Sequence, residues 1–306
     1  YNYKFRRACR QADRIIAVSE CTKRDIVSLY HIAPEKIDVV YQGCDPAFKQ
    51  AVPEEKKEEV KKRYQLPEKY ILYVGSIESR KNLMLLARAL CHLDASYQVI
   101  AVGKHTSYAD KVTRFLAHEG LQSRMRLIHG VPFSDLPALY QCATTFVYPS
   151  FYEGFGIPLL EALNSGVPAI GAHGSCLEEA GGPSSLYVAP TDEKGLAEAI
   201  RRPYTDASLR ERMIEEGKKY AAQFEPEPLT RQLLAIYQKL TEKESVMQIS
   251  VVINTYNASK HLKEVLEAVK EFDEVLVCDM ESTDDTCRIA AGFGCRIITF
   301  PKGLHQ

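Results

Sequence analysis

The sequence predicts an α/β fold, with a Rossmann-like parallel sheet followed by a partial second α/β unit. Two observations predict it. From Tyr70 onward, short apolar runs alternate with segments of helical periodicity, a pattern typical of an open parallel sheet with helices on both faces. At Met247 a similar alternation starts again and continues to Thr299. The 306 residues, 45% of them hydrophobic, are enough for two separate cores.

The composition excludes several classes of protein. A net charge of −1 provides no basic field for nucleic acid, so we expect no nucleic-acid partner. No apolar run has the length of a transmembrane helix, and no secretory signal opens the chain. The nine cysteines form no CxxC pair and no zinc-type cluster, which indicates free thiols in a reducing cytoplasm. Because the chain starts at Tyr1 and stops soon after a strand pattern, we interpret it as a fragment cut at both ends.

Residues 1–50 contain two short strand patterns around one helix. Arg14–Val18 is the first strand, Ser19 is a suitable N-cap for the helix, and Lys36–Tyr41 is the second strand. Residues 51–68 then form a charged linker or helix. Their run of Glu and Lys suits a solvated face better than a binding patch.

Residues 69–245 contain the main alternation. Parallel sheets of this kind bind ligands at the carboxyl ends of their strands, so the loops after the first and fourth strands are candidate sites. The expected strands are Tyr70–Val74, Gln98–Val102, Met125–Ile128, Thr145–Tyr148, Pro168–Gly171 and Leu186–Val188. The expected helices are Leu83–Leu93, Ala109–Gly120, Asp135–Ala143, Ile157–Asn164, Glu193–Arg201, Ala207–Phe224 and Glu227–Glu244.

The loop after the fourth strand reads Glu-Gly-Phe-Gly, residues 153–156, and enters a helix with Pro158 in its first turn. The glycines let the backbone approach a ligand, and the helix start offers unpaired N–H groups. Glu161, about one turn into the helix, could accept hydrogen bonds from two sugar hydroxyls. Taken alone, Glu153 could be an ordinary residue of a strand-to-helix loop, and Glu161 could be a solvated helix residue. Together, the string predicts a site for a phosphorylated sugar.

The loop after the first strand begins at Gly75 and Ser76 and carries Arg80 and Lys81 at the mouth of the next helix. It is neither a dinucleotide fingerprint nor a P-loop, because the required glycines are absent. A guanidinium and an ammonium side by side can neutralise a diphosphate leaving group without a metal. The alternative is a basic pair in solvent, and the glutamate string downstream favours diphosphate binding.

These two loops together resemble the signature of the retaining GT-B glycosyltransferases of family four. The resemblance implies that residues 69–245 are the GT-B donor domain and that residues 1–50 are the tail of the acceptor-side domain. Glu178 stands where the family commonly has proline. The implied catalytic residues are Glu153, Arg80 and Lys81. The implied donor-binding residues are Gly75, Ser76, Gly154, Phe155, Gly156, Glu161 and Ser175.

Residues 246–306 resemble the N-terminus of the inverting GT-A glycosyltransferases of family two, through the opening Val-Val-Ile-Asn-Thr-Tyr-Asn and an Asp-rich loop. Met280 and Glu281 replace the Asp and Gly that usually follow the first Asp of that loop. The family's metal-binding Asp-x-Asp would lie beyond Gln306, so Mg or Mn belongs to a complete GT-A module only. The implied nucleotide-binding residues are Thr255, Tyr256 and Asp279.

The resemblance implies a bifunctional sugar transferase of polysaccharide or lipopolysaccharide biosynthesis. Its first module would move a sugar from a nucleotide diphosphate sugar to a glycan or lipid-linked acceptor, with retention and without a cofactor. This chain alone would be inactive, and the full parent would associate peripherally with the inner face of the membrane.

No Asp or Glu in the sequence stands out as the nucleophile of a double displacement, so we expect an electrostatic mechanism assisted by the leaving group. Two other classes stay open. One is a non-catalytic module that binds a nucleotide sugar. The other is a Rossmann-type epimerase or dehydrogenase, against which the missing Gly-x-Gly-x-x-Gly argues. The sequence names neither the base, the sugar nor the acceptor.

Overall fold

The computed structural model describes residues 2–241 and 249–300. The chain divides into two compact units, Tyr1–Leu234 and Ala235–Gln306. The expected domain boundary at 245–246, the restart at Met247 and the expected helix end at Glu244 lie outside the described residues. Within the described part of the chain, every helix is too short or too polar to cross a membrane.

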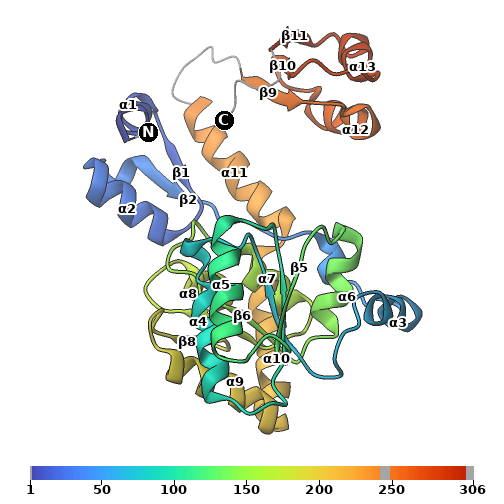
Figure 1. Ribbon diagram of the computed structural model, residues 1–306. Helices are drawn as coiled ribbons and strands as arrows, with labels where there is room; N and C mark the ends of the chain where they lie inside the picture. Colours follow the sequence, from blue (N-terminus) through green and yellow to red (C-terminus); the bar gives the residue numbers. More distant parts are fainter. Residues whose placement is uncertain (1, 242–248, 301–306) are drawn as a thin grey trace. The chain divides into compact units, whose positions relative to one another are not determined.

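The first unit is built around a six-stranded parallel sheet with the order β5-β4-β3-β6-β7-β8 (Figure 1). Every residue of β4, β6 and β7 is buried, as expected of parallel strands covered on both faces. The predicted α/β fold with a parallel sheet is therefore confirmed. The strands are β3 (Ile71–Val74), β4 (Val99–Val102), β5 (Met125–Ile128), β6 (Thr145–Tyr148), β7 (Ala169–Ala172) and β8 (Leu186–Val188).

The strand order reverses between β3 and β6, which pair directly through Ile71 with Thr145 and Leu72 with Phe146. In open α/β sheets, ligands bind outside the carboxyl ends of the strands at such a reversal. The loops after β3 and β6, the two loops singled out in the sequence, therefore start from neighbouring strands.

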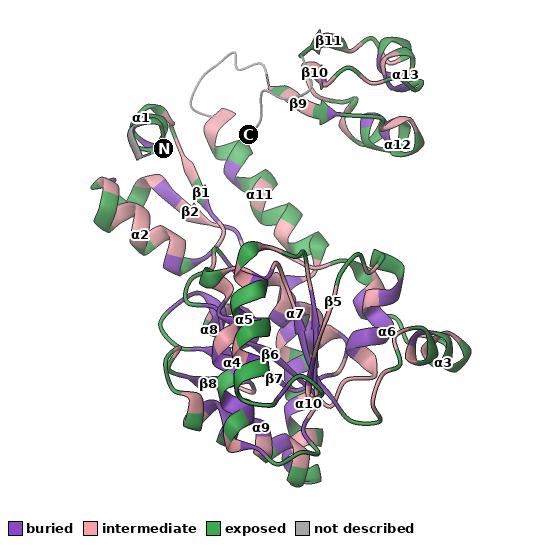
Figure 2. Cartoon of the chain, in the orientation of Figure 1, coloured by how far each residue is buried: buried purple, intermediate pink, exposed green. Residues whose placement is uncertain are grey.

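Helices cover the sheet in two groups (Figure 1), one with α4, α5 and α9 in contact and one with α7, α8 and α10 in contact. Figure 2 shows the buried residues concentrated in the strands and in the helix sides that face them. The helix expected at Leu83–Leu93 ends earlier and continues as a 3₁₀ turn, Leu90–His92. The helices are α4 (Leu83–Ala89), α5 (Ser107–His118), α6 (Leu136–Gln141), α7 (Ile157–Asn164), α8 (Leu177–Gly181), α9 (Glu193–Thr205), α10 (Ala207–Ala221) and α11 (Pro226–Thr241).

The N-terminal segment forms a small parallel pair of strands, β1 (Ile15–Ala17) and β2 (Ile37–Val39), with helix α2 (Glu20–Tyr30) between them in the sequence. Ser19 is the N-cap of α2, as predicted, and its side chain accepts a hydrogen bond from the Thr22 N–H. Helix α1 (Asn2–Gln11), which the sequence analysis did not predict, precedes β1.

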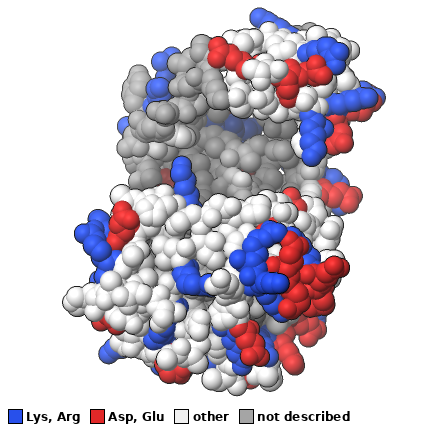
Figure 3. All heavy atoms as spheres, turned by 45° about the vertical axis from the view of Figure 1, so that its right-hand side comes forward, with Lys and Arg blue, Asp and Glu red and all other residues white. Residues whose placement is uncertain are grey.

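The charged run after this segment forms helix α3 (Glu54–Arg63). Its lysines pair with glutamates three residues earlier, Lys57 with Glu54 and Lys61 with Glu58, both at 2.7 Å. Figure 3 brings forward the side of the molecule that carries α3, and acidic and basic side chains lie next to one another there. The structure thus agrees with a solvated charged helix.

The second unit is a three-stranded parallel sheet with the order β11-β10-β9. Two helices pack on it around a small core of Leu262, Leu266, Val277 and Ala290. Its elements follow the predicted order of strand, helix, strand, Asp-rich loop, helix and strand. They are β9 (Ser250–Thr255), α12 (Ser259–Val269), β10 (Glu274–Asp279), α13 (Thr286–Gly292) and β11 (Arg296–Thr299).

Candidate functional site

The carboxylate of Glu153 lies where the loops after β3 and β6 meet. Its Oε1 accepts hydrogen bonds from the hydroxyls of Ser150 at 2.8 Å and Tyr148 at 2.9 Å. The Lys81 ammonium lies 3.2 Å from the same oxygen, and the Arg80 guanidinium lies 2.8 Å from Oε2. The structure therefore brings together the three residues that the resemblance implies to be catalytic.

This cluster contains two cations and is partly open to solvent. Burial raises the pKa of the Glu153 carboxyl, but hydrogen bonds from Arg80 and Ser150 and the charge of Lys81 outweigh it, so the pKa is lowered overall. Glu153 is therefore ionised at neutral pH, and with Glu78, whose carboxylate lies 3.2 Å from the Arg80 guanidinium, two carboxylates balance the two cations. The Arg80 side chain is 43% exposed, whereas that of Glu153 is 12% exposed. The arrangement can receive an anion from the solvent side.

Tyr148, the last residue of β6, connects the two charges. The Lys81 ammonium donates a 2.5 Å hydrogen bond to its hydroxyl, which in turn donates to Glu153. Burial raises the pKa of Tyr148, so the hydroxyl stays protonated and can donate. The apolar pattern of the sequence predicts Tyr148 in a buried strand but gives no indication of this contact. The available signal was its position at the carboxyl end of the strand, directly before the loop.

Replacing Tyr148 by phenylalanine should weaken binding of the nucleotide sugar that the family resemblance implies about tenfold, because it removes one hydrogen bond to a charged group and leaves the ring in place. The measurement is a calorimetric titration. Tyr70→Phe is a matched control, since Tyr70 is also buried and its hydroxyl donates to the Leu139 carbonyl at 2.6 Å, at the opposite end of β3. Equal affinities in the two variants would contradict a role for the Tyr148 hydroxyl.

Glycines allow close backbone approaches around the cluster. Gly156 has a φ of +116°, and a Cβ there would lie 2.8 Å from the Leu177 Cδ2 atom, so the loop can enter α7 only with glycine at this position. A Cβ on Gly103, after β4, would lie 1.9 Å from the carbonyl oxygen of Gly75. The backbones of the loops after β3 and β4 therefore touch.

Phe155 and Gly154 lie in the middle of this loop and differ in burial. The Phe155 ring is buried between Tyr41 and Phe224, with ring centroids 5.5 and 5.3 Å away. Only its backbone could therefore contact a ligand. Gly154 is exposed, and its carbonyl oxygen accepts a 2.7 Å hydrogen bond from the Ser19 hydroxyl.

Glu161 lies in α7, half-buried, and its Oε2 accepts a 2.7 Å hydrogen bond from the hydroxyl of Tyr140. Burial raises the pKa of Glu161, and the hydrogen bond from Tyr140 offsets part of this rise. Tyr140 is fully buried and is a second contact that the sequence analysis missed, because it looked like a core residue of α6.

The remaining residues of these loops, Ser76, Ser175 and Glu178, are held mainly by local contacts. The Ser76 hydroxyl donates to Glu78 at 2.7 Å, and the buried Ser175 hydroxyl accepts from the Leu177 N–H at 3.4 Å. Glu178, where the family commonly has proline, lies 2.7 Å from His173 Nδ1 and accepts from the Gly174 N–H at 3.3 Å. Its carboxylate therefore closes this loop by hydrogen bonds.

In the second unit, Thr255 and Asp279 lie at the carboxyl ends of β9 and β10, with the Thr255 hydroxyl donating to Asp279 at 2.9 Å. Asp279 also accepts from the N–H of Ser282 at 2.8 Å and from its hydroxyl at 2.6 Å. Burial raises the pKa of the Asp279 carboxyl, but these hydrogen bonds outweigh it and the pKa is lowered. Tyr256 is 40% exposed.

A divalent ion, such as that of a complete GT-A module, requires a set of ligands. Nowhere in residues 2–241 and 249–300 do three or more His, Cys, Asp or Glu side chains gather in a way that could hold a metal. Asp279, the most buried carboxylate of the Asp-rich loop, already accepts three hydrogen bonds.

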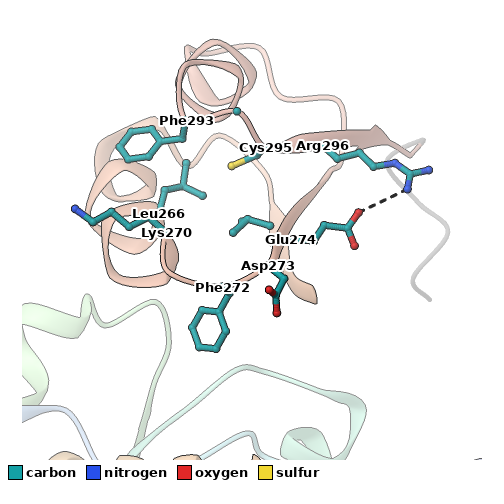
Figure 4. A pocket seen from close by; sticks show the side chains of 10 residues that line it. Leu266, Lys270, Phe272, Asp273, Glu274, Phe293, Cys295 and Arg296 are labelled. Carbon is teal, nitrogen blue, oxygen red and sulfur yellow. Dashed lines mark ion pairs between the residues drawn. The ribbon is translucent and has the colours of Figure 1, made fainter. Parts of the chain in front are cut away.

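A cavity of about 250 Å³ lies elsewhere in the second unit (Figure 4). Phe272 and Phe293 line it, and Arg296 lies 3.7 Å from Glu274 at its edge. Glu274 and Arg296 are the first residues of β10 and β11, so the cavity lies at the amino ends of the strands, opposite Asp279. It contains none of the predicted nucleotide-binding residues.

Three family models match the chain. The model "Glycosyl transferases group 1" matches residues 54–220, "Glycosyltransferase Family 4" matches residues 1–48, and "Glycosyl transferase family 2" matches residues 250–306. The chain is 34% identical over 235 residues to O-antigen chain mannosyltransferase B of Escherichia coli, covering 75% of this chain and 61% of that protein. It is 29% identical to O-antigen chain mannosyltransferase RfbU of Salmonella typhimurium, covering 66% of this chain and 54% of that protein. The chain thus spans less than two thirds of these relatives.

Among solved structures, HepE of Anabaena in complex with UDP and glucose has the same fold, with a TM-score of 0.72 at 18% identity, covering 78% of this chain and 68% of that chain. The first unit is thus a GT-B-like Rossmann domain, as the resemblance implied. Since the group 1 model matches more than half of the sequence, the chain belongs to the group 1 glycosyl transferases.

Proposed function

We propose that this chain holds the donor site of a transferase that moves mannose from a nucleoside diphosphate sugar to a glycan or lipid-linked acceptor, with retention. The observation that carries the proposal is the meeting of Arg80, Lys81 and Glu153 at the reversal of strand order. Two cations and one carboxylate suit a diphosphate attached to a sugar. The two curated relatives described above are mannosyltransferases of O-antigen chains, which supports mannose and lipopolysaccharide synthesis.

In the proposed reaction, Arg80 and Lys81 neutralise the charge that develops on the departing diphosphate. The bond between the anomeric carbon and the diphosphate oxygen breaks, and its electron pair stays on that oxygen. The acceptor hydroxyl forms the new bond on the same face and gives its proton to the departing diphosphate. Glu153 positions the sugar, Glu161 holds the ribose, and the N–H groups of residues 154–156 assist at the phosphates.

We further propose that the second unit begins a second transferase, so that the parent is bifunctional. The family 2 match over residues 250–306 and the nucleotide-type loop at Asp279 support this. Membership of the group 1 family sets aside an epimerase or dehydrogenase. A module that binds a nucleotide sugar without transferring it remains the alternative, because the chain spans only part of its relatives.

The proposal is tested by titrating the chain with UDP, GDP and ADP in a calorimeter, with and without magnesium. We expect one diphosphate to bind independently of the metal, and Glu161→Ala to weaken its binding at least about tenfold, because the ribose loses a charged hydrogen-bond acceptor. Glu198→Ala is the control, since Glu198 is an exposed residue of α9 that pairs with Arg201 at 2.7 Å. Absence of binding by all three diphosphates, or equal binding by both variants, would contradict the proposal.

A further inference from the structure

The first turn of helix α2 receives an acceptor from a distant part of the chain. The carboxylate of Glu179, in α8, accepts hydrogen bonds from the backbone N–H groups of Glu20 at 2.7 Å and Cys21 at 2.8 Å. The first N–H groups of a helix have no partner within the helix, and the helix start carries a partial positive charge. Glu179 satisfies two of these groups and supplies the opposite charge.

The same turn of α2 contacts the loop that carries Glu153. The Ser19 and Thr22 hydroxyls lie 2.7 and 3.1 Å from the carbonyl oxygen of Gly154. Ser19 is fully buried, and its side chain also accepts from the Thr22 N–H at 3.0 Å. The capped end of α2 therefore holds the Gly154 carbonyl from one side.

Helix α8 contacts the loop from the other side. The Cys176 thiol, at the start of α8, lies 3.0 Å from the carbonyl oxygen of Glu153. The backbone of Glu179 is itself held by a 2.7 Å hydrogen bond from the Tyr220 hydroxyl. The loop at Glu153 and Gly154 thus lies between α8 and α2, and Glu179 joins these two helices.

A helix cap alone would stabilise α2 and do nothing more. Here the capped turn also places two hydroxyls on one carbonyl next to the proposed catalytic carboxylate. We propose that Glu179 is a positioning residue, which holds Ser19 and Thr22 against Gly154 and so orders the loop of residues 153–156 around the sugar of the donor. This inference rests on the proposed function, because that function supplies the sugar.

The test is Glu179→Gln in the full chain. Glutamine keeps the size of the side chain but has one acceptor oxygen where two N–H groups need acceptors. We expect the affinity for GDP-mannose to fall about tenfold, which corresponds to the loss of one hydrogen bond to a charged group. If another base binds, the sugar nucleotide of that base is the probe. The affinity for the diphosphate without sugar should change less than about twofold, because Arg80, Lys81 and Glu161 are untouched and no hydrogen bond to the diphosphate is lost.

Two further readouts separate positioning from stability. Backbone order parameters of residues 153–156 should fall from about 0.85 to below about 0.6 in Glu179→Gln. Thr22→Val, which removes the hydroxyl, should act in the same direction, whereas Thr22→Ser, which keeps it, should behave as the unmodified chain. These variants leave the carboxylate of Glu179 in place and so test the hydroxyl contact itself.

The control is Asp206→Ala. Asp206 caps α10 by accepting from the Leu209 N–H at 2.9 Å, so its loss also removes a helix cap. It should lower the melting temperature but leave the loop ordered. A lower melting temperature in Glu179→Gln with unchanged order parameters and an unchanged affinity ratio would overturn the inference. If the unmodified chain binds no nucleotide, the proposed function fails, and the order parameters still decide whether Glu179 orders the loop.

Discussion

Replacing Arg80 and Lys81 together by alanine is expected to weaken binding of the nucleoside diphosphate by about 10²–10⁴-fold. Each hydrogen bond to a charged group contributes about 1.5–3 kcal/mol, and the double variant loses two of them. The rate of transfer should fall at least as far, because the same two cations face the charge that develops on the leaving group. Calorimetry on this chain measures the first effect. A transfer assay on an enzyme with a complete acceptor-side domain measures the second.

The matched control is Lys61→Ala with Lys62→Ala, which removes a basic pair from helix α3. Lys61 there forms an ion pair with the exposed Glu58 at 2.7 Å. This control should bind the diphosphate normally. A thermal melt of the Arg80 and Lys81 double variant shows whether Glu153, deprived of both cations, still permits folding. A folded double variant that binds the diphosphate as tightly as the unmodified chain would refute the assignment.

Glu153→Gln should separate binding from transfer. Removing the carboxylate makes the cluster more positive by one charge, so the diphosphate should bind as well as before or several-fold more tightly. Transfer should nevertheless fall about 10²-fold or more, because the group proposed to position the sugar has changed. The same calorimetric and transfer assays test both effects. Parallel losses of diphosphate affinity and transfer would mean that Glu153 only maintains the structure.

The same variant also tests how the Glu153 carboxylate contributes to the stability of the fold at acidic pH. The pKa of Glu153 is lowered from its ordinary value of 4.5, so its ionised form stabilises the fold above that value. This stabilisation is lost as the pH falls through the lowered pKa of the folded state. The difference in melting temperature between the unmodified chain and Glu153→Gln should therefore shrink as the pH is lowered from 7 toward about 3. A difference that is constant over this range would contradict the lowered pKa.

The sheet and its two loops were predictable because both depend on local pattern. Buried parallel strands give short apolar runs, and the residues directly after them must lie at one edge of the sheet. Arg80, Lys81 and Glu153 could be expected at the same edge for this reason, and the pairing of β3 with β6 brings them together although 72 residues separate Lys81 from Glu153.

The residues that the sequence analysis missed depend on orientation within the core. Tyr148 and Tyr140 belong to a buried strand and a buried helix face, where periodicity says nothing about which way a hydroxyl points. Phe155 shows the converse, since it stands within the signature string but its ring packs in the core. The contact of Glu179 with Glu20 joins residues 159 positions apart, and no spacing rule reaches that far.

The contact between Gly103 and Gly75 has a consequence for how the site can change. Two backbones that meet without side chains between them leave nothing that can rotate aside, so a shift of one loop displaces the other. The loop after β4 is therefore mechanically tied to the loop that carries Arg80 and Lys81. Substitutions that reshape the loop after β4 would therefore be transmitted to the two cations, and His129, directly after β5, lies 2.6 Å from the Gly103 carbonyl oxygen and so belongs to the same linked set.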